Sequence, residues 1–308
     1  MTSVENFSPV APWILFTIFA ALMQSVRTAG QKSLSNSITP MSATLVRYVF
    51  GLPIAIVYLI ALSGGHTIDQ LSHALTLSEF IWPAMLAGVF QIIATVLLIL
   101  LFRFRNFMVG TSFAKTESVM TAVIGTLFFA APLSAFGWIA VVLGVIGVWL
   151  MAVPDRNEPW SIYVVCLGLG SGACFALTSL WIRQASLSLG IDVMTSAAIT
   201  LVLVVTFQSL LCLLYTVVVT PEEFLKITAS LPLALFVGAT SALGSIGWFT
   251  AMSWQNPALV KSLGQIEILF TAMLTLRFFR ERIRVVECLG VAMLVFSVVI
   301  LVQFSEQL

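Results

Sequence analysis

The sequence contains few charged residues: Asp, Glu, Lys and Arg make up only 9% of its 308 residues, whereas a soluble domain carries roughly a quarter. Hydrophobic residues make up 60% of the chain, and its mean hydropathy is +1.08. A chain of this composition requires lipid as its solvent. The formal net charge is +1 and the basic residues form no stripe, so nucleic acid is excluded as a partner.

Catalytic and cofactor-binding motifs are also missing. The two histidines, His66 and His73, lie in a polar connection, which leaves no HExxH and no base beside a Ser or Cys nucleophile. No Walker A loop is present to couple ATP. The four cysteines lie in apolar runs without a CxxC pair, namely Cys166, Cys174, Cys212 and Cys288. We therefore expect no metal, no other cofactor and no enzyme activity.

Long apolar runs dominate the sequence instead. A helix needs about 20 apolar residues to cross roughly 30 Å of hydrocarbon, and ten stretches meet this length: 12–31, 40–62, 80–102, 107–129, 135–153, 161–182, 193–217, 231–253, 257–279 and 285–304. The preceding segment MTSVENFSPV lacks basic residues and a cleavage site, so the first run is interpreted as a span and not as a signal peptide. The connections are short and rich in Gly, Pro and charge, which predicts no soluble domain.

Two segments resemble each other at a constant offset of 150 residues. NFMVGTSFAKTESVMTAVIGTLFF (106–129) and NPALVKSLGQIEILFTAMLTLRFF (256–279) share seven of 24 residues. The matches include Asn106 with Asn256 at the entries and Glu117 with Glu267 in mid-span. Apolar matches are frequent among membrane spans, but these polar ones are not. We interpret them as an internal repeat.

The repeat predicts an all-α membrane protein of ten transmembrane helices, arranged as two five-helix halves at 1–154 and 155–308. An odd number of spans per half forces the copies into opposite orientations in the membrane. Such inverted repeats are typical of secondary transporters, whose binding site lies near the midplane between the halves. We therefore expect a central cavity there.

The ten-span pattern and the run LFTAMLTLRFFRERI (269–283), with its Glu281, resemble the EamA family of the drug/metabolite transporter superfamily. The first half departs from the pattern, with Ala131 before Pro132 where the family has the equivalent Glu. Ser118 and Ile268 follow the two mid-span glutamates where many members have proline, which predicts straighter helices. The resemblance implies ten helices around a cavity, export or exchange of small metabolites, and a multi-pass protein of the bacterial plasma (inner) membrane.

The two mid-span glutamates are the main candidates for the site. Glu117 and Glu267 are each the eleventh residue of their span, which places them about 15 Å deep. A carboxylate at that depth costs several kcal/mol, so it should face a cavity or a partner. Thr121 and Thr271, four residues later, are placed to donate a hydrogen bond to the carboxyl groups. Because burial favours the protonated form, we expect the glutamates to bind protons or a cationic substrate in turn.

Basic residues near the glutamates leave two interpretations open. In one, Lys115, Lys261, Arg27 or Arg47 merely neutralises each carboxylate; Lys115 lies about 200° away from Glu117 on its own helix, so the pair would have to join different helices. In the other, Lys115, Lys261 and Arg27 bind a substrate carboxylate while the glutamates bind an amine, as an amino acid requires. Arg27 and Arg47 also fit an interfacial position, near the ends of their spans.

Other polar residues in mid-span complete the candidate set. Gln24, Gln91 and Gln265 must find hydrogen bonds without water, either lining the cavity or joining helices. Most tryptophans lie near span starts and fit an interfacial belt. Trp248, deep in the eighth span, is the best candidate for an aromatic cage around a quaternary amine.

The orientation in the membrane is open between two indications. The side reached after odd-numbered spans carries nine Lys and Arg residues and the other side only Arg183. By the positive-inside rule the termini are then outside, whereas the family resemblance implies termini inside.

Three functions compete on this sequence. The leading one is a secondary active transporter, with a small polar metabolite, amino acid or organic cation as its substrate, membrane lipid around it and protons as the coupling ion. The second is an intramembrane enzyme acting on a lipid, although the loop acids Asp155, Glu158, Glu222 and Glu223 have no His or Cys beside them. The third is a structural partner, which would not explain matching buried glutamates.

Overall fold

The computed structural model describes residues 11–103, 116–131, 133–152 and 162–274, together with scattered positions between 277 and 300. In these residues the chain is all-helical. The first half contains α1 (Pro12–Leu34), α2 (Pro40–Val49), α3 (Leu52–Ser63), α4 (Thr67–Thr76), α5 (Ser78–Leu101), α7 (Glu117–Phe128) and α8 (Ala135–Ala152). The second contains α9 (Ile162–Ser188), α10 (Val193–Val219), α11 (Glu223–Ala229), α12 (Leu231–Trp254), α13 (Pro257–Leu263) and α14 (Glu267–Leu274).

The beginnings of these helices follow from local sequence chemistry. Proline stands in the first turn of α1, α2, α3, α12 and α13, where its missing N–H costs no hydrogen bond. Side chains cap three helices by accepting hydrogen bonds from free backbone N–H groups: Thr39 for α2, Asp192 for α10 and Asn256 for α13. Asn256 is the entry asparagine of the second repeated segment, and the matching Asn106 lies outside the described residues.

Seven helical segments in the described residues are long and apolar enough to cross a membrane. They are Pro12–Leu34, Pro40–Thr76, Ser78–Leu101, Ile162–Ser188, Val193–Val219, Leu231–Trp254 and Pro257–Leu274. Glu117–Phe128 and Ala135–Gly147 are shorter apolar helices. Most of the predicted tenth span, 285–304, lies outside the described residues. The structure thus confirms a multi-pass helical membrane protein but not the count of ten spans.

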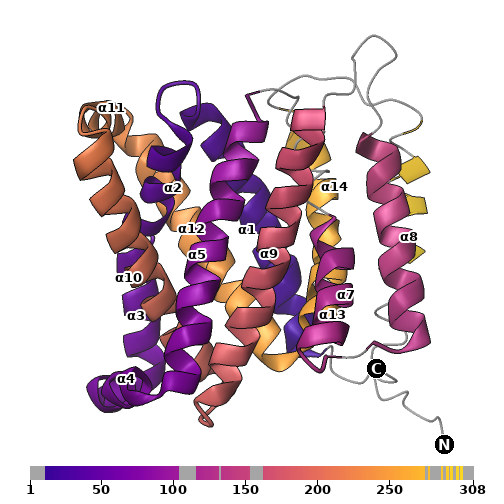
Figure 1. Ribbon diagram of the computed structural model, residues 1–308, viewed down its shortest axis with the longest axis horizontal. Helices are drawn as coiled ribbons and strands as arrows, with labels where there is room; N and C mark the ends of the chain where they lie inside the picture. The colour runs from indigo at the N-terminus through magenta and orange to yellow at the C-terminus, as the bar shows by residue number, and fades with distance from the viewer. Residues whose placement is uncertain are drawn as a thin grey trace, which may run out of the picture.

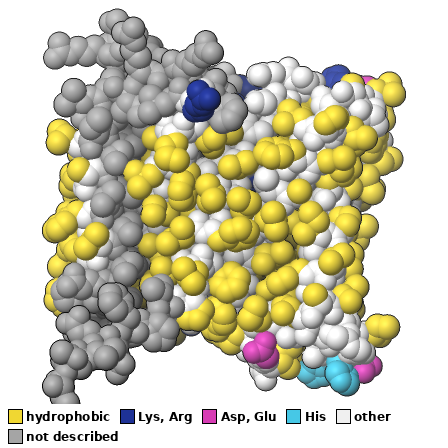
Figure 2. All heavy atoms as spheres, turned by 180° about the vertical axis from the view of Figure 1, so that it is seen from behind, with side chains coloured by type: hydrophobic (Ala, Val, Ile, Leu, Met, Phe, Trp, Pro, Cys, Tyr) yellow, Lys and Arg dark blue, Asp and Glu magenta, His cyan; other side chains and the backbone are white. Residues whose placement is uncertain are grey.

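The helices stand side by side and run between two opposite ends of the molecule (Figure 1). Hydrophobic side chains cover the visible face between these ends, while Lys and Arg lie at the upper edge and His at the lower edge (Figure 2). An apolar band between two polar ends is the surface that a lipid bilayer requires. The closest packing joins the two halves of the sequence, because α1 packs along α12 and α5 packs along α9.

Glycine permits this close packing at one decisive point. A Cβ atom at Gly247 of α12 would lie 2.7 Å from the backbone oxygen of Phe16 and 2.8 Å from the Cβ of Ala20, both on α1. Small residues let helix backbones approach one another in membranes, where packing rather than the hydrophobic effect holds helices together.

Two spans are interrupted near their middles. The second span breaks between α2 and α3 at Phe50 and Gly51. The ninth breaks at a 3-10 turn, Gly264–Ile266, directly before Glu267. The prediction of a straighter ninth helix, made from the absence of a proline, was therefore wrong. A glycine in a crowded position replaces the proline as the helix-breaking residue.

Two short helices lie in the connections. α4 follows the first interrupted span and carries the exposed His73; His66 ends the 3-10 turn before it. α11 lies between α10 and α12, and its Glu223 accepts hydrogen bonds from the Lys226 ammonium at 2.6 Å and from the Thr39 N–H at 2.7 Å. Burial opposes ionisation of Glu223, but these bonds outweigh it and hold its pKa below the ordinary value.

Candidate functional site

A small polar cavity lies between the helices at the centre of the described structure. Its volume is about 20 Å³, room for about one water molecule, whereas ligand pockets measure roughly 300 Å³ or more. The helices must therefore move apart before a metabolite can enter. Six helices from both halves line it: Gln24 (α1), Arg47 (α2), Gln91 (α5), Phe175, Thr178, Ser179 and Ile182 (α9), Ser245, Trp248, Phe249 and Met252 (α12), and Lys261 (α13).

Trp248 organises one wall of this cavity. The Lys261 ammonium lies 4.3 Å from the centre of the Trp248 ring, at cation–π distance. The Trp248 Nε1–H donates a hydrogen bond of 2.7 Å to the Gln24 Oε1 atom. A Cβ atom at Gly264 would overlap the Trp248 ring, so the glycine of the 3-10 turn admits this tryptophan. Because Lys261 already lies against the ring, Trp248 does not stand as an open cage.

The two glutamates of the repeat contact residues of this cavity wall but do not line the cavity themselves. A Glu117 carboxylate oxygen lies 3.5 Å from the Lys261 ammonium, and both side chains are 6% exposed. A Glu267 oxygen accepts a hydrogen bond of 2.7 Å from the Gln24 Nε2 atom. A continuous series of side-chain contacts, which we call the glutamate chain, connects the two carboxylates: Glu117, Lys261, Trp248, Gln24 and Glu267. Both carboxylates lie one residue behind the cavity wall.

Each glutamate is the first residue of a helix. Glu117 begins α7 and Glu267 begins α14. Figure 1 places α14 in the upper part of the molecule and α7 and α13 in the lower part. The Glu267 backbone N–H is not free, because it donates to the backbone oxygens of Gly264 and Gln265 in the 3-10 turn.

The threonines one turn after the glutamates take a different role from the expected one. The Thr121 hydroxyl donates a hydrogen bond of 2.6 Å to the backbone oxygen of Glu117 and not to its carboxylate. The Thr271 hydroxyl is buried and has no hydrogen-bond partner in the part of the chain that the structure describes. The polar strip predicted on these two faces is therefore not formed as expected.

The remaining glutamines divide between the two interpretations left open for them. Gln91 lines the cavity and accepts a hydrogen bond of 2.8 Å from the Gln208 amide on α10. Gln265 lies away from the lining and donates a hydrogen bond of 2.5 Å to the Ser118 hydroxyl, which joins the 3-10 turn to α7. Gln91 thus belongs to the cavity, and Gln265 joins two helices.

The basic candidates are placed as follows. Lys261 pairs with Glu117 across two helices, as one interpretation required, and Lys115 lies outside the described residues. Arg27 is 3% exposed and Arg47 is 4% exposed, so both side chains are buried within the protein and neither extends to its surface. Arg47 lines the cavity, which sequence reasoning missed. The available signal was a cation inside an apolar span that contains no acidic residue.

A larger open groove lies at the lower end, beside the central cavity. Its volume is about 1360 Å³, and its lining includes Trp82 on α5, Phe128 at the end of α7 and Trp181 on α9. Arg183, also in this lining, donates hydrogen bonds of 2.8 and 2.7 Å to the backbone oxygens of Met252 and Gln255. The same stretch of α9 contributes to both linings, with Thr178, Ser179 and Ile182 at the cavity and Leu180, Trp181 and Arg183 at the groove.

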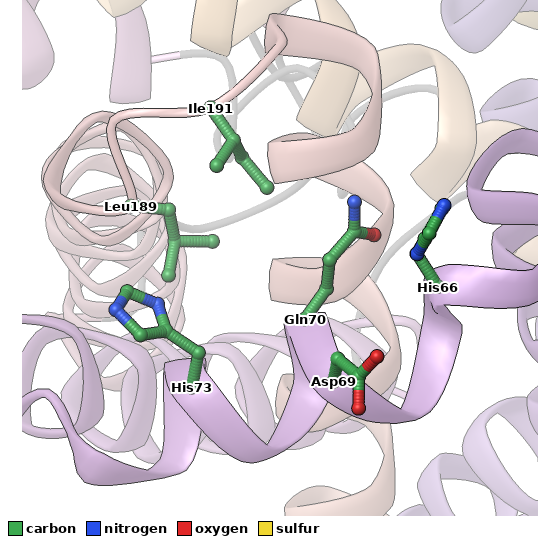
Figure 3. A pocket seen from close by; sticks show the side chains of 6 residues that line it. All are labelled: His66, Asp69, Gln70, His73, Leu189 and Ile191. Carbon is green, nitrogen blue, oxygen red and sulfur yellow. The ribbon is translucent and has the colours of Figure 1, made fainter.

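A further pocket of about 350 Å³ lies between α4 and the residues after α9 (Figure 3). It is lined by His66, Asp69, Gln70, His73, Leu189 and Ile191. The two imidazoles lie at its two ends and do not converge (Figure 3). The described residues contain no group of three or more His, Cys, Asp or Glu side chains placed to hold a metal. This pocket is therefore not a metal centre.

These features define a multi-pass helical membrane protein with an occluded polar cavity at its centre. Residues 11–153 match the model of the EamA-like transporter family, which confirms the resemblance seen in the sequence. The matched segment indicates a membrane transporter of the drug/metabolite type.

Comparison with solved structures supports the same fold. A structure described as "Crystal structure of protein", one of 24 matching chains, has a TM-score of 0.72 and 13% identity. The match covers 97% of this chain and 99% of the other. At this identity the likeness establishes the fold alone. Among curated proteins, no relative matches this chain.

Proposed function

We propose that the protein is a secondary active transporter that moves a small polar metabolite through the central cavity. In this proposal residues 1–154 and 155–308 are inverted five-helix halves in a plasma membrane of the bacterial type, and they rock against each other around the cavity. The transporter family and the position of the cavity between helices of both halves support the proposal.

The single observation that carries the proposal is the glutamate chain. It joins a carboxylate from each half to the wall of a closed polar cavity. A protein that merely packs in the bilayer has no need for such a chain, because each buried charge costs free energy.

Proton coupling through Glu117 and Glu267 is the second part of the proposal. If Glu117 takes up a proton, its attraction to the Lys261 ammonium is lost and Lys261 is released toward the cavity. Protonation of Glu267 likewise changes what the Gln24 amide can donate to, and Gln24 holds the Trp248 indole. Protonation of either glutamate thus changes the wall that contacts the substrate.

The ion pair also keeps the simpler interpretation in place, in which Lys261 only neutralises Glu117. The two interpretations differ in their consequences for transport. A neutralising pair can be replaced by neutral residues without loss of proton dependence, whereas a coupling pair cannot.

Exchange of radiolabelled metabolites by the purified protein in proteoliposomes tests the proposal. We expect external unlabelled substrate to accelerate loss of internal label, as alternating access requires. Conversion of a lipid or lipid-linked compound into a product, without movement of any solute, would overturn it in favour of an intramembrane enzyme.

A further inference from the structure

Arg47 is the one cavity-lining cation in the described residues for which the structure provides no acidic partner. Its guanidinium donates a hydrogen bond of 2.8 Å to the Thr95 hydroxyl, and its Nε–H has no partner in the described part of the chain. The Thr95 hydroxyl in turn donates to the backbone oxygen of Gln91 at 2.8 Å. Every hydrogen bond that Arg47 makes here is therefore to a neutral group.

The charges buried within the spans do not balance around it. Three buried cations, Arg27, Arg47 and Lys261, stand against two buried carboxylates, Glu117 and Glu267, in the described spans. Lys261 pairs with Glu117, and Arg27 lies within electrostatic range of Glu267. No described carboxylate acts on Arg47 in this way. A buried charge without a counter-charge is costly, so such a group calls for an anion.

A second small cavity, of about 10 Å³, adjoins Arg47 on another side. Arg47 and Ser245 line both this space and the central cavity, so the two meet at these residues. Tyr48 and Ser241 also line the second cavity, and the Ser241 hydroxyl has no hydrogen-bond partner among the described residues. Tyr48 and Ser241 are each only 2% exposed.

These residues together form a buried site that favours an anionic oxygen group. Arg47, Tyr48 and Ser241 are buried residues that line one space, and each side chain carries a group that can donate a hydrogen bond. Oxygen atoms that carry negative charge accept such bonds most strongly, and arginine pairs with them in a bidentate manner. A purely cationic substrate would instead meet an unpaired positive charge.

We infer that the transported substrate carries an oxyanion group, a carboxylate or a phosphate, and that this group binds Arg47 beside Tyr48 and Ser241. The inference rests on the proposed transport function and narrows its substrate class by excluding simple organic cations. A substrate that also carries an amine, such as an amino acid, places that amine toward the side of the cavity where Glu117 and Glu267 lie. The negative charge of the substrate then provides the counter-charge that Arg47 lacks among the described residues.

Thermal unfolding of the purified full-length protein tests this inference without requiring transport. The probes are a panel of amino acids, each beside its carboxamide and its deaminated acid, together with inorganic phosphate and glycerol phosphate. We expect stabilisation only by compounds that retain a carboxylate or a phosphate, and the panel distinguishes the two groups. In Arg47→Gln the affinity of the best probe should fall at least about 100-fold, as expected on loss of about 3 kcal/mol from a charged hydrogen-bonded pair.

Three further measurements keep the test decisive. Arg103→Gln removes an exposed cation outside the cavity and should leave the probe's affinity within about two-fold, a small change in binding free energy. Arg47→Lys keeps the charge and should retain part of the affinity, which also covers the case in which Arg47→Gln does not fold. Absence of counterflow together with intact oxyanion binding would contradict the proposed transport function but not the inference about the oxyanion site.

Stabilisation by compounds that lack any anionic group would overturn the inference. So would unchanged affinity in Arg47→Gln, or the failure of every anionic probe to stabilise the wild-type protein.

Discussion

Breaking the ion pair between Lys261 and Glu117 should destabilise the protein strongly. The two charged atoms lie 3.5 Å apart and both side chains are 6% exposed. At an effective dielectric constant of about 20, charges at this separation attract one another by about 5 kcal/mol. Lys261→Met removes this attraction and leaves the Glu117 carboxylate buried, for which the typical cost is about 3–5 kcal/mol.

A double-mutant cycle in detergent micelles measures the coupling. We expect Glu117→Gln combined with Lys261→Met to be more stable than Lys261→Met alone, with a coupling energy of at least about 2 kcal/mol at pH 7. A coupling below about 1 kcal/mol, the range of solvent-exposed pairs, would refute the conclusion that this pair is buried and structural to the site.

Two further predictions concern packing and pH. Gly264→Ala should lower the free energy of unfolding by about 1–3 kcal/mol, because its Cβ atom would overlap the Trp248 ring. In the control Gly170→Ala the Cβ atom would lie 3.4 Å from a leucine methyl group, so the unfolding temperature should change little. Equal effects of the two substitutions would contradict the packing argument. Glu223→Gln should cost about 1–3 kcal/mol at neutral pH, because Glu223 is 1% exposed and accepts hydrogen bonds from Lys226 and a backbone N–H. Because folding lowers the pKa of Glu223, its carboxylate stabilises the fold at neutral pH, and this stabilisation is lost as the pH falls through the lowered pKa. The unfolding temperatures of the variant and the wild type should therefore converge in acid. A difference that is constant with pH would show that the charge of Glu223 is not involved.

The class of fold could be predicted from the sequence because one physical term dominates it. Apolar runs of spanning length have few alternatives to a helix in lipid, since every backbone group must be satisfied within its own segment. Breaks inside the spans depend instead on local packing between side chains of different helices. The 3-10 turn at Gly264–Ile266 forms where the Trp248 ring packs against a position without a Cβ atom, and no local rule for proline predicts it.

The candidate site was predictable where a residue broke the pattern of its span. Glu117, Glu267, Gln24 and Lys261 stood out as polar residues in apolar runs, and the glutamate chain connects them. Arg47 was missed because its depth depends on how α2 sits in the bundle and not on its distance from the end of the run. Which helices face one another, and so which cation meets which carboxylate, is a long-range property of the packing.

Counterflow under an imposed pH gradient tests proton coupling through Glu117 and Glu267. Wild-type protein and the double variant Glu117→Gln with Glu267→Gln are reconstituted at equal density, and exchange of an internal labelled substrate is measured with and without the gradient. We predict that the gradient accelerates exchange by the wild type and that the double variant loses this dependence. Transport that is indifferent both to the gradient and to the two substitutions would contradict it.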